Sequence, residues 1–381
     1  MKIEQAYEFV NDATKEILGE QAIDPTQDLS KIVDIGKALE DAQGVDAYVR
    51  AIANRIGRML FVTRAYKGIL PKVLKSSWEF GSIVGKLQAE LMEAKENEAW
   101  ELQQGASYDP YVVNLPVVSA KFWNQLATFE LDITLPEDQV KQSFASADEQ
   151  MKFLAMLETM VNNSMELKID ALTRAALVNY IGALVASGNA TPRCVKLLSD
   201  YNTIAGTSLN AQQALINDDF LRYACAVILE YKERLAEYST LFNEGGKARH
   251  TPAELLHVVM HTTFATRMKT HLGSTTYHKD LVELPLYEEV AFWQGSGTGF
   301  ALADTSKVAG KITKADGTTA DVEQAYVVGF MFDNDALGIL QPERKVKSIY
   351  NPKGEFYNQF HKWNSRQFND FNENGVVFLL A

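Results

Sequence analysis

The sequence predicts an α+β protein in which one long helix lies across a sheet. Residues 146–188 carry apolar side chains at helical spacing and contain no proline, which favours a single helix. Residues 78–136 alternate between apolar and polar side chains as strands do, and residues 341–381 form an aromatic-rich extended stretch. A helix of about 40 residues is roughly 60 Å long. It therefore needs a sheet, a coiled-coil partner or a neighbouring subunit to lie on.

Both ends of the long helix carry recognisable signals. Ser146 can cap the first turn, and Glu149 stands three residues later, at the capping-box spacing. Gly188 supplies a left-handed stop, and Pro192 prevents the helix from resuming. Because the polar residues 162–164 interrupt a strict heptad seam, we expect a helix lying on a sheet in a plate-like protein.

Length and composition narrow the class of protein. The chain has 381 residues, of which 46% are hydrophobic and 23% are charged, which is typical of a globular protein of two or three domains. The net charge of −12 argues against specific binding of DNA or RNA. Cys194 and Cys225 are too few for a disulfide framework and lack metal-site spacing. We find no apolar run near the ~18 residues of a membrane span, and the acidic N-terminal segment is unlike a signal peptide, so we expect synthesis in the cytoplasm.

The N-terminal segment is amphipathic. Residues 2–19 and 29–64 have helical patterns with one apolar side, so this side is expected to pack against another part of the chain or against a neighbour. A small helical subdomain and an extended arm that reaches a neighbour are both compatible with this pattern.

Residues 78–136 predict a long two-stranded hairpin with a polar, acidic tip at 92–111. Two strands alone cannot bury a face and are only marginally stable. The hairpin therefore implies a partner surface, most simply another copy of the same chain, and shelter by its own chain would contradict this interpretation. Pro136 and the acids after it are expected to open a short helix at 136–144.

The second half of the chain mixes helices and strands. Asp316-Gly317 is a strong hairpin signal, and the turn at 333–335 separates two apolar strands. We expect helices at 191–201, 209–243 and 266–272, extended segments at 255–261, 282–295 and 325–340, a turn at 351–354, and a final strand at 376–380 that belongs to the sheet.

The order of these parts resembles the major capsid proteins of tailed bacteriophages, which share the Hong Kong 97-type fold. The phrases most similar to the short-tailed phi-29 type are DITLPEDQVKQSFASADEQMKFLAMLETMVNNSMEL, MFDNDALGIL and YNPKGEFYNQFHKWNSRQFNDFNENGVVFL. The likeness extends from about Trp78 to the end of the chain and is weakest in 1–60 and 190–310.

The resemblance implies a division of the chain. Residues 1–77 would form an N-terminal helical arm and residues 78–136 an extended loop that overlaps the adjacent subunit. Residues 137–190 and 341–381 would form a peripheral domain containing the long helix, and residues 191–340 an axial domain.

The resemblance also implies a function. The chain would be a structural protein of the virion that self-assembles, through pentamers and hexamers, into an icosahedral head enclosing double-stranded DNA. Scaffolding, portal and decoration proteins would be partners, the packaged DNA would be touched only non-specifically, and no membrane would be involved. An encapsulin-type nanocompartment shell, which loads enzyme cargo, is the alternative within the same fold.

No catalytic, cofactor-binding or metal-binding residue is predicted, and no cofactor. A metal-dependent enzyme is nevertheless a second alternative, because five of the six histidines lie between His250 and His278. His257 and His261 are four residues apart, but the motif HVVMH lacks the glutamate of a zinc protease. On a strand these two histidines would be about 13 Å apart, so we interpret them as ordinary packed or exposed side chains.

Other suggestive groups have ordinary interpretations. The glycine-rich segment 295–299 is expected to be an ordinary loop and not a phosphate-binding one, since it lacks the combination of a strand before it and a helix N-terminus after it. We expect solvated side chains for the acids Glu288, Glu289, Asp333 and Asp335. We expect core packing for the methionines Met151, Met156, Met160 and Met165. The sequence marks no cross-linking lysine among Lys86, Lys95 and Lys121.

Overall fold

The structure is a computed structural model of the chain, and it describes residues 64–68, 70, 73–75, 84–101, 103–124, 126–136, 147–188, 192–275, 287–294, 306–340 and 345–381. The chain divides into two compact units, which we describe separately: residues 1–67, 130–166 and 344–362 form the first, and residues 68–129, 167–343 and 363–381 form the second. Apart from Arg64 and Pro136, the helices predicted at 2–19, 29–64 and 136–144 lie outside the described residues, as does the glycine loop 295–299.

The long helix is confirmed as α5 (Ala147–Ala186). It ends as the sequence predicts, because Gly188 has a positive φ of 123°, which favours glycine. The polar break in its apolar seam also has a role in the first unit. The Asn163 side chain donates to the carbonyl of Arg64 at 2.7 Å and accepts from the backbone N–H of Tyr66 at 2.8 Å.

Part of α5, Ala155–Ala186, is long and apolar enough to cross a membrane by length and composition, contrary to the expectation from the sequence. However, 61% of its most apolar window is buried inside the protein. The helix also carries a buried ion pair, in which Arg174 Nε lies 2.8 Å from Asp170 Oδ2. We conclude that this apolarity belongs to the protein's own core.

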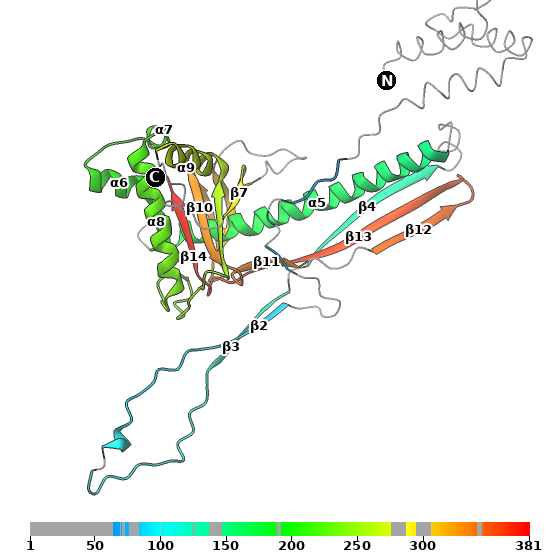
Figure 1. Cartoon of the computed structure of the whole chain (residues 1–381). Helices are drawn as coiled ribbons and strands as arrows, with labels where there is room; N and C mark the ends of the chain where they lie inside the picture. Colours follow the sequence, from blue (N-terminus) through cyan, green and yellow to red (C-terminus); the bar gives the residue numbers. More distant parts are fainter. Residues whose placement is uncertain are drawn as a thin grey trace, which may run out of the picture. The chain divides into compact units, whose positions relative to one another are not determined.

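A five-stranded sheet forms the centre of the second unit. Its strands follow the order β5-β14-β10-β6-β7, of which Figure 1 labels β14, β10 and β7. Their bounds are β5 Cys194–Lys196, β14 Gly375–Leu379, β10 Val327–Asp333, β6 Leu256–His261 and β7 Glu288–Val290. The three central strands are antiparallel, and the two edge strands are parallel to their neighbours. The C-terminal strand therefore belongs to the sheet, as predicted.

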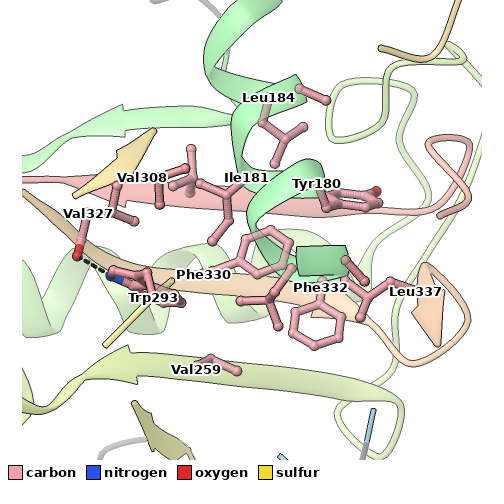
Figure 2. Close-up of a cluster of buried hydrophobic side chains, with 14 of the residues drawn as sticks. Tyr180, Ile181, Leu184, Val259, Trp293, Val308, Val327, Phe330, Phe332 and Leu337 are labelled. Carbon is pink, nitrogen blue, oxygen red and sulfur yellow. Dashed lines mark hydrogen bonds between the residues drawn. The ribbon is translucent and has the colours of Figure 1, made fainter. Parts of the chain in front are cut away.

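Both faces of this sheet are buried, because alternate side chains of its strands enter two different apolar clusters. On one face, the ring of Tyr180 of α5 lies 5.5 Å from the ring of Phe330, and Trp293 donates its indole N–H to the carbonyl of Val327 at 2.8 Å. Figure 2 shows Tyr180, Ile181 and Leu184 of α5 in this cluster together with side chains of β10. On the other face, Met331 and Phe378 meet three helices: α6 (Leu197–Ala205), α8 (Asp218–Ala236) and α9 (Thr262–Thr275).

A small hairpin lies against the C-terminal part of α5. Its strands are β8 (Val308–Thr313) and β9 (Thr319–Gln324), and Gly317 has a φ of 79° in the turn, which confirms the Asp316-Gly317 prediction. Ile312 approaches α5 where the helix has Gly182, and the Asn179 side chain accepts from the backbone N–H of Thr313 at 2.7 Å.

The second sheet has the order β1-β11-β13-β12, and β4 also pairs with β13. The bounds are β1 Leu74–Lys75, β11 Leu337–Leu340, β13 Phe356–Asn369, β12 Lys345–Asn351 and β4 Leu126–Pro136. In the first unit β12 pairs with the start of β13, and Lys362 forms an ion pair with Glu130 of β4 at 3.2 Å. The predicted long hairpin is therefore corrected: its second arm does not stay paired with the first through residue 136, because β4 joins β13.

Two predicted helices also need correction. Residues 194–196 form β5 before α6 begins, because they pair in parallel with β14. The helix expected over 209–243 is instead α7 (Ala211–Ala214) followed by α8, each started by its own cap. Asn210 accepts from the N–H of Gln213 at 2.9 Å, and Asn217 accepts from the N–H of Phe220 at 2.8 Å.

Candidate assembly surface

Residues 84–124 form an arm in the second unit. Its base is a two-stranded ribbon of β2 (Val84–Ala89) and β3 (Val118–Trp123), paired antiparallel from Val84 opposite Trp123 to Ala89 opposite Val118. One more backbone bond, from Glu90 N–H to the Val117 carbonyl at 2.8 Å, extends the pairing. Residues 90–117 form the tip of the arm, in which residue 102 lies outside the described residues. The ribbon confirms that the hairpin exists, over a shorter span than predicted.

The ribbon has one polar face that touches the rest of its unit and one apolar face that is exposed. Opposite residues of an antiparallel pair share a face. Lys86 and Lys121, which are paired, are therefore on the same side, together with Val84 and Trp123. The other face carries Leu87, Val118 and Phe122, whose exposed fractions are 74%, 58% and 68%. The Phe122 ring lies over Gly85, 3.1 Å from where a Cβ would stand.

The tip carries further exposed apolar side chains. Those with the largest exposure are Leu91, Met92, Trp100, Tyr111, Val112, Val113, Leu115 and Val117. Hydrogen bonds within the tip join residues close together in the sequence, such as Tyr111 N–H to Asp109 Oδ1 at 2.9 Å and Ala106 N–H to Gln103 O at 3.2 Å. A large exposed apolar surface on a subunit marks an interaction site.

A buried carboxylate joins the two strands of the ribbon. Lys121 Nζ lies 2.8 Å from Asp370 Oδ1, and Lys86 Nζ lies 3.0 Å from Asp370 Oδ2. Burial alone would raise the pKa of the Asp370 carboxyl. The hydrogen bond from Lys121 and the charges of Lys86 and Lys121 outweigh burial and lower that pKa.

Further contacts surround this carboxylate. Lys86 also donates to Glu373 at 2.8 Å, and Gln88 donates to the same carboxylate oxygen. Arg249 donates to Gln88 at 2.8 Å and lies 3.5 Å from Glu373. The ribbon is thus tied through its polar face to the turn that contains Asp370 and Glu373.

That turn is itself fixed to the core of the second unit. Asp370 donates its backbone N–H to Ala336 at 2.6 Å, and the Tyr180 hydroxyl of α5 donates to the Glu373 carbonyl at 2.9 Å. Gly375 donates to the Phe242 carbonyl at 2.9 Å. The polar face of the ribbon is therefore attached to a turn that several hydrogen bonds hold to the core.

The histidines do not form a metal centre in the part of the chain that the structure describes, where no group of three or more His, Cys, Asp or Glu side chains could hold a metal ion. His257 contacts Asn334 at 2.9 Å, and His271 contacts Asp218 at 2.6 Å. His261 is buried, which lowers its pKa. His278 lies outside the described residues.

Several other sequence expectations are refined. Asp333 is buried and accepts a hydrogen bond from Thr251 at 2.7 Å, so the prediction that its side chain is solvated was wrong. Asp335 is exposed, as predicted. Met160 is 45% exposed, which corrects the expectation that it packs in the core. Lys86 and Lys121, considered in the sequence only as cross-linking candidates, instead hold carboxylates.

Sequence reasoning missed Asp370, Glu373 and Arg249. The available signal was the pair of acids in the segment NDFNENG, but the lysines that they meet stand 249 and 287 residues away.

Comparison with solved structures defines the class of protein. The capsid structure of Staphylococcus phage Andhra matches with a TM-score of 0.57 and 10% identity, over 85% of this chain and 87% of that chain. A structure of the head fiber and inner core protein gp22 of native bacteriophage P68 matches with a TM-score of 0.57 and 11% identity, over the same shares. The capsid structure of Cyanophage P-SCSP1u matches with a TM-score of 0.51 and 8% identity, over 85% of this chain and 91% of that chain. The fold is thus that of phage capsid proteins of the Hong Kong 97-type.

The sequence then places the chain within this class. The family model described as Phi29-like phage major capsid protein matches residues 10–379, and the chain belongs to that family. No curated protein matches the sequence. The chain is accordingly the major capsid protein of a phi29-like phage head, a structural component of the virion and not an enzyme. Membership of this family excludes the two alternative functions considered from the sequence, a nanocompartment shell and a metal-dependent enzyme.

Proposed function

We propose that a neighbouring copy of this chain covers the apolar face of the ribbon and the tip when the head forms. The observation that carries this proposal is the exposure of Leu87, Val118 and Phe122 on one face of a two-stranded ribbon. Apolar surface removed from water contributes roughly 25 cal/mol per Å², and a ribbon of two strands cannot supply that burial itself.

A second copy is the occupant that the geometry favours. Every copy of a shell carries the same arm. A head-to-tail contact, in which each arm reaches the next subunit, forms a closed ring when the rotation between neighbours is a whole fraction of a full turn. We propose that these rings are the pentamers and hexamers of an icosahedral shell around the double-stranded DNA, and that residues 191–340 form the axial domain at their centres.

Charge supports a specific docking place on the neighbour. Residues 90–101 contain five glutamates and one lysine, a net charge of 1 − 5 = −4. Residues 345–362, which include β12 and the start of β13, contain four lysines and one glutamate, a net charge of 4 − 1 = +3 with histidine neutral. Val346 and Ile349 of β12 are exposed as well. We propose that the tip of one copy docks on this basic hairpin of the next, since complementary charges favour correct encounters.

Other partners follow from the role of the shell. We propose that scaffolding, portal and decoration proteins contact it, and that the packaged DNA touches it only non-specifically. The net charge of −12 supports the last point, because a chain with a net negative charge has little attraction for phosphates.

The experiment removes the apolar face of the ribbon without touching its polar face. Leu87→Ser combined with Phe122→Ser should raise the protein concentration at which particles form by at least about tenfold. Electron microscopy and sedimentation measure particle formation, and circular dichroism checks that the fold is retained.

The matched control is Met160→Ser, because Met160 is 45% exposed on α5, outside the arm, the proposed docking hairpin and residues 191–340. It should assemble at the wild-type concentration. Normal assembly of the double variant would contradict the proposal.

A further inference from the structure

We propose that Asp370 is a positioning residue that holds the ribbon in one orientation on its own subunit before any neighbour binds. Its carboxylate bridges Lys86 of β2 and Lys121 of β3, so one side chain restrains both strands. The consequence for assembly rests on the proposed role of the arm, whereas the restraint itself is a property of the single subunit.

The ribbon needs such a restraint because its own residues do not favour pairing of its two strands. Lys86 and Lys121 are directly opposite each other in the pairing, and like charges at such positions repel. Six residue pairs in two strands are also marginally stable without a third surface. A shared carboxylate turns the repulsion into two ion pairs that require the strands to be paired.

Asp370 is suited to this role because it cannot follow the ribbon if the ribbon moves. Its side chain is fully buried, its backbone N–H is held by Ala336 at 2.6 Å, and its Oδ1 accepts from the Asn372 N–H at 3.1 Å. A charge-assisted hydrogen bond to a fixed, buried partner is stronger than one on the surface.

Neighbouring contacts set the same orientation. The Trp123 ring lies 5.4 Å from that of Phe368, and Lys86 also meets Glu373, whose carbonyl is held by Tyr180. An arm ordered in advance loses less conformational freedom when it docks. The neighbour therefore meets a preformed apolar face.

The test is amide hydrogen exchange on the full-length chain, kept dilute enough that light scattering detects single copies. In Asp370→Asn the amides of 84–89 and 118–123 should exchange at least about tenfold faster than in the wild type. The amides of α8 and β10 should keep their wild-type rates. Unchanged exchange in the ribbon would overturn the proposal.

A second variant keeps every residue of the buried turn unchanged and alters only the arm. Lys86→Met combined with Lys121→Met removes both cations from the arm and should also accelerate exchange in the ribbon alone. Lys121→Arg keeps the charge and should keep the slow exchange. If the lysine double variant exchanges at the wild-type rate, the carboxylate does not position the ribbon.

The control is Lys307→Met, which breaks the ion pair of Lys307 with Glu323 on the β8–β9 hairpin. It should leave exchange in the ribbon unchanged, and acceleration there would overturn the assignment. Since exchange is measured on single copies, it is independent of docking. Leu87→Ser with Phe122→Ser should keep the slow exchange and assemble only at a higher protein concentration, so failure of either proposal is distinguishable from failure of the other.

Discussion

Gly182 is the position at which the packing of α5 can be tested most sharply. A Cβ added there would stand 2.6 Å from Ile312 Cγ2, 3.5 Å from Ile312 Cβ and 3.7 Å from Ile312 Cδ1. All three atoms belong to one side chain of β8. The perturbation is therefore Gly182→Ala, alone and in combination with Ile312→Ala.

Two opposed effects set the magnitude. Alanine is favoured over glycine inside a helix by about 1 kcal/mol, whereas overpacking a core costs about 1–3 kcal/mol. Gly182→Ala alone should thus change the free energy of unfolding by between zero and about −2 kcal/mol. In Ile312→Ala the nearest remaining atom is the Cβ at 3.5 Å, an ordinary contact, so there the same change should stabilise by about 1 kcal/mol.

The assay is equilibrium denaturation in urea, followed by tryptophan fluorescence, on all four members of the cycle. Trp293 reports directly, because it belongs to the same buried cluster as Ile312. Ile312→Ala alone should cost about 2–5 kcal/mol. The reasoning is refuted if Gly182→Ala has the same effect in both backgrounds to within about 0.5 kcal/mol, which is the range expected for independent sites.

Two further predictions concern buried titratable groups. Burial raises the pKa of the Cys194 and Cys225 thiols, so an aromatic disulfide reagent should label neither in the folded chain and both in urea; rapid labelling under native conditions would contradict this. Burial is also the main reason that the pKa of Asp333 is raised above 3.8. The folded state then holds this proton more tightly than the unfolded state, so stability from this group is present below pH 3.8 and is lost as the pH rises through the raised value. The stability of Asp333→Asn relative to the wild type should therefore increase over that interval in denaturation curves measured from pH 3 to pH 7, and a difference that stays constant or falls would argue against a buried, costly charge.

Local pattern was sufficient for several elements. The helix from 147 to 186 has a continuous apolar period and signals at both ends. The hairpin at Asp316-Gly317 and the strands on either side of 333–335 also formed where the sequence predicts them. In each case the pattern of neighbouring residues was enough to predict the conformation.

Strand partners did not follow from local pattern. The alternation of residues 126–136 identifies a strand and its apolar face, but it fits pairing with β2 as well as pairing with β13. Helix caps inside an apolar run were missed for a related reason. Asn210 and Asn217 can lie within a helix or start one, and packing around 209–236 decides which.

The sequence by itself determined the long helix, the presence of a hairpin arm and the resemblance to a capsid protein, because periodicity, turn residues and local phrases are properties of adjacent positions. Only the tertiary structure decided which face of the arm is tied down and which is left open. Lys86 and Lys121 meet Asp370 across more than half of the chain, and one strand register selects the side of the ribbon that faces that carboxylate. A contact of this kind depends on how distant segments fold together, which no local pattern encodes.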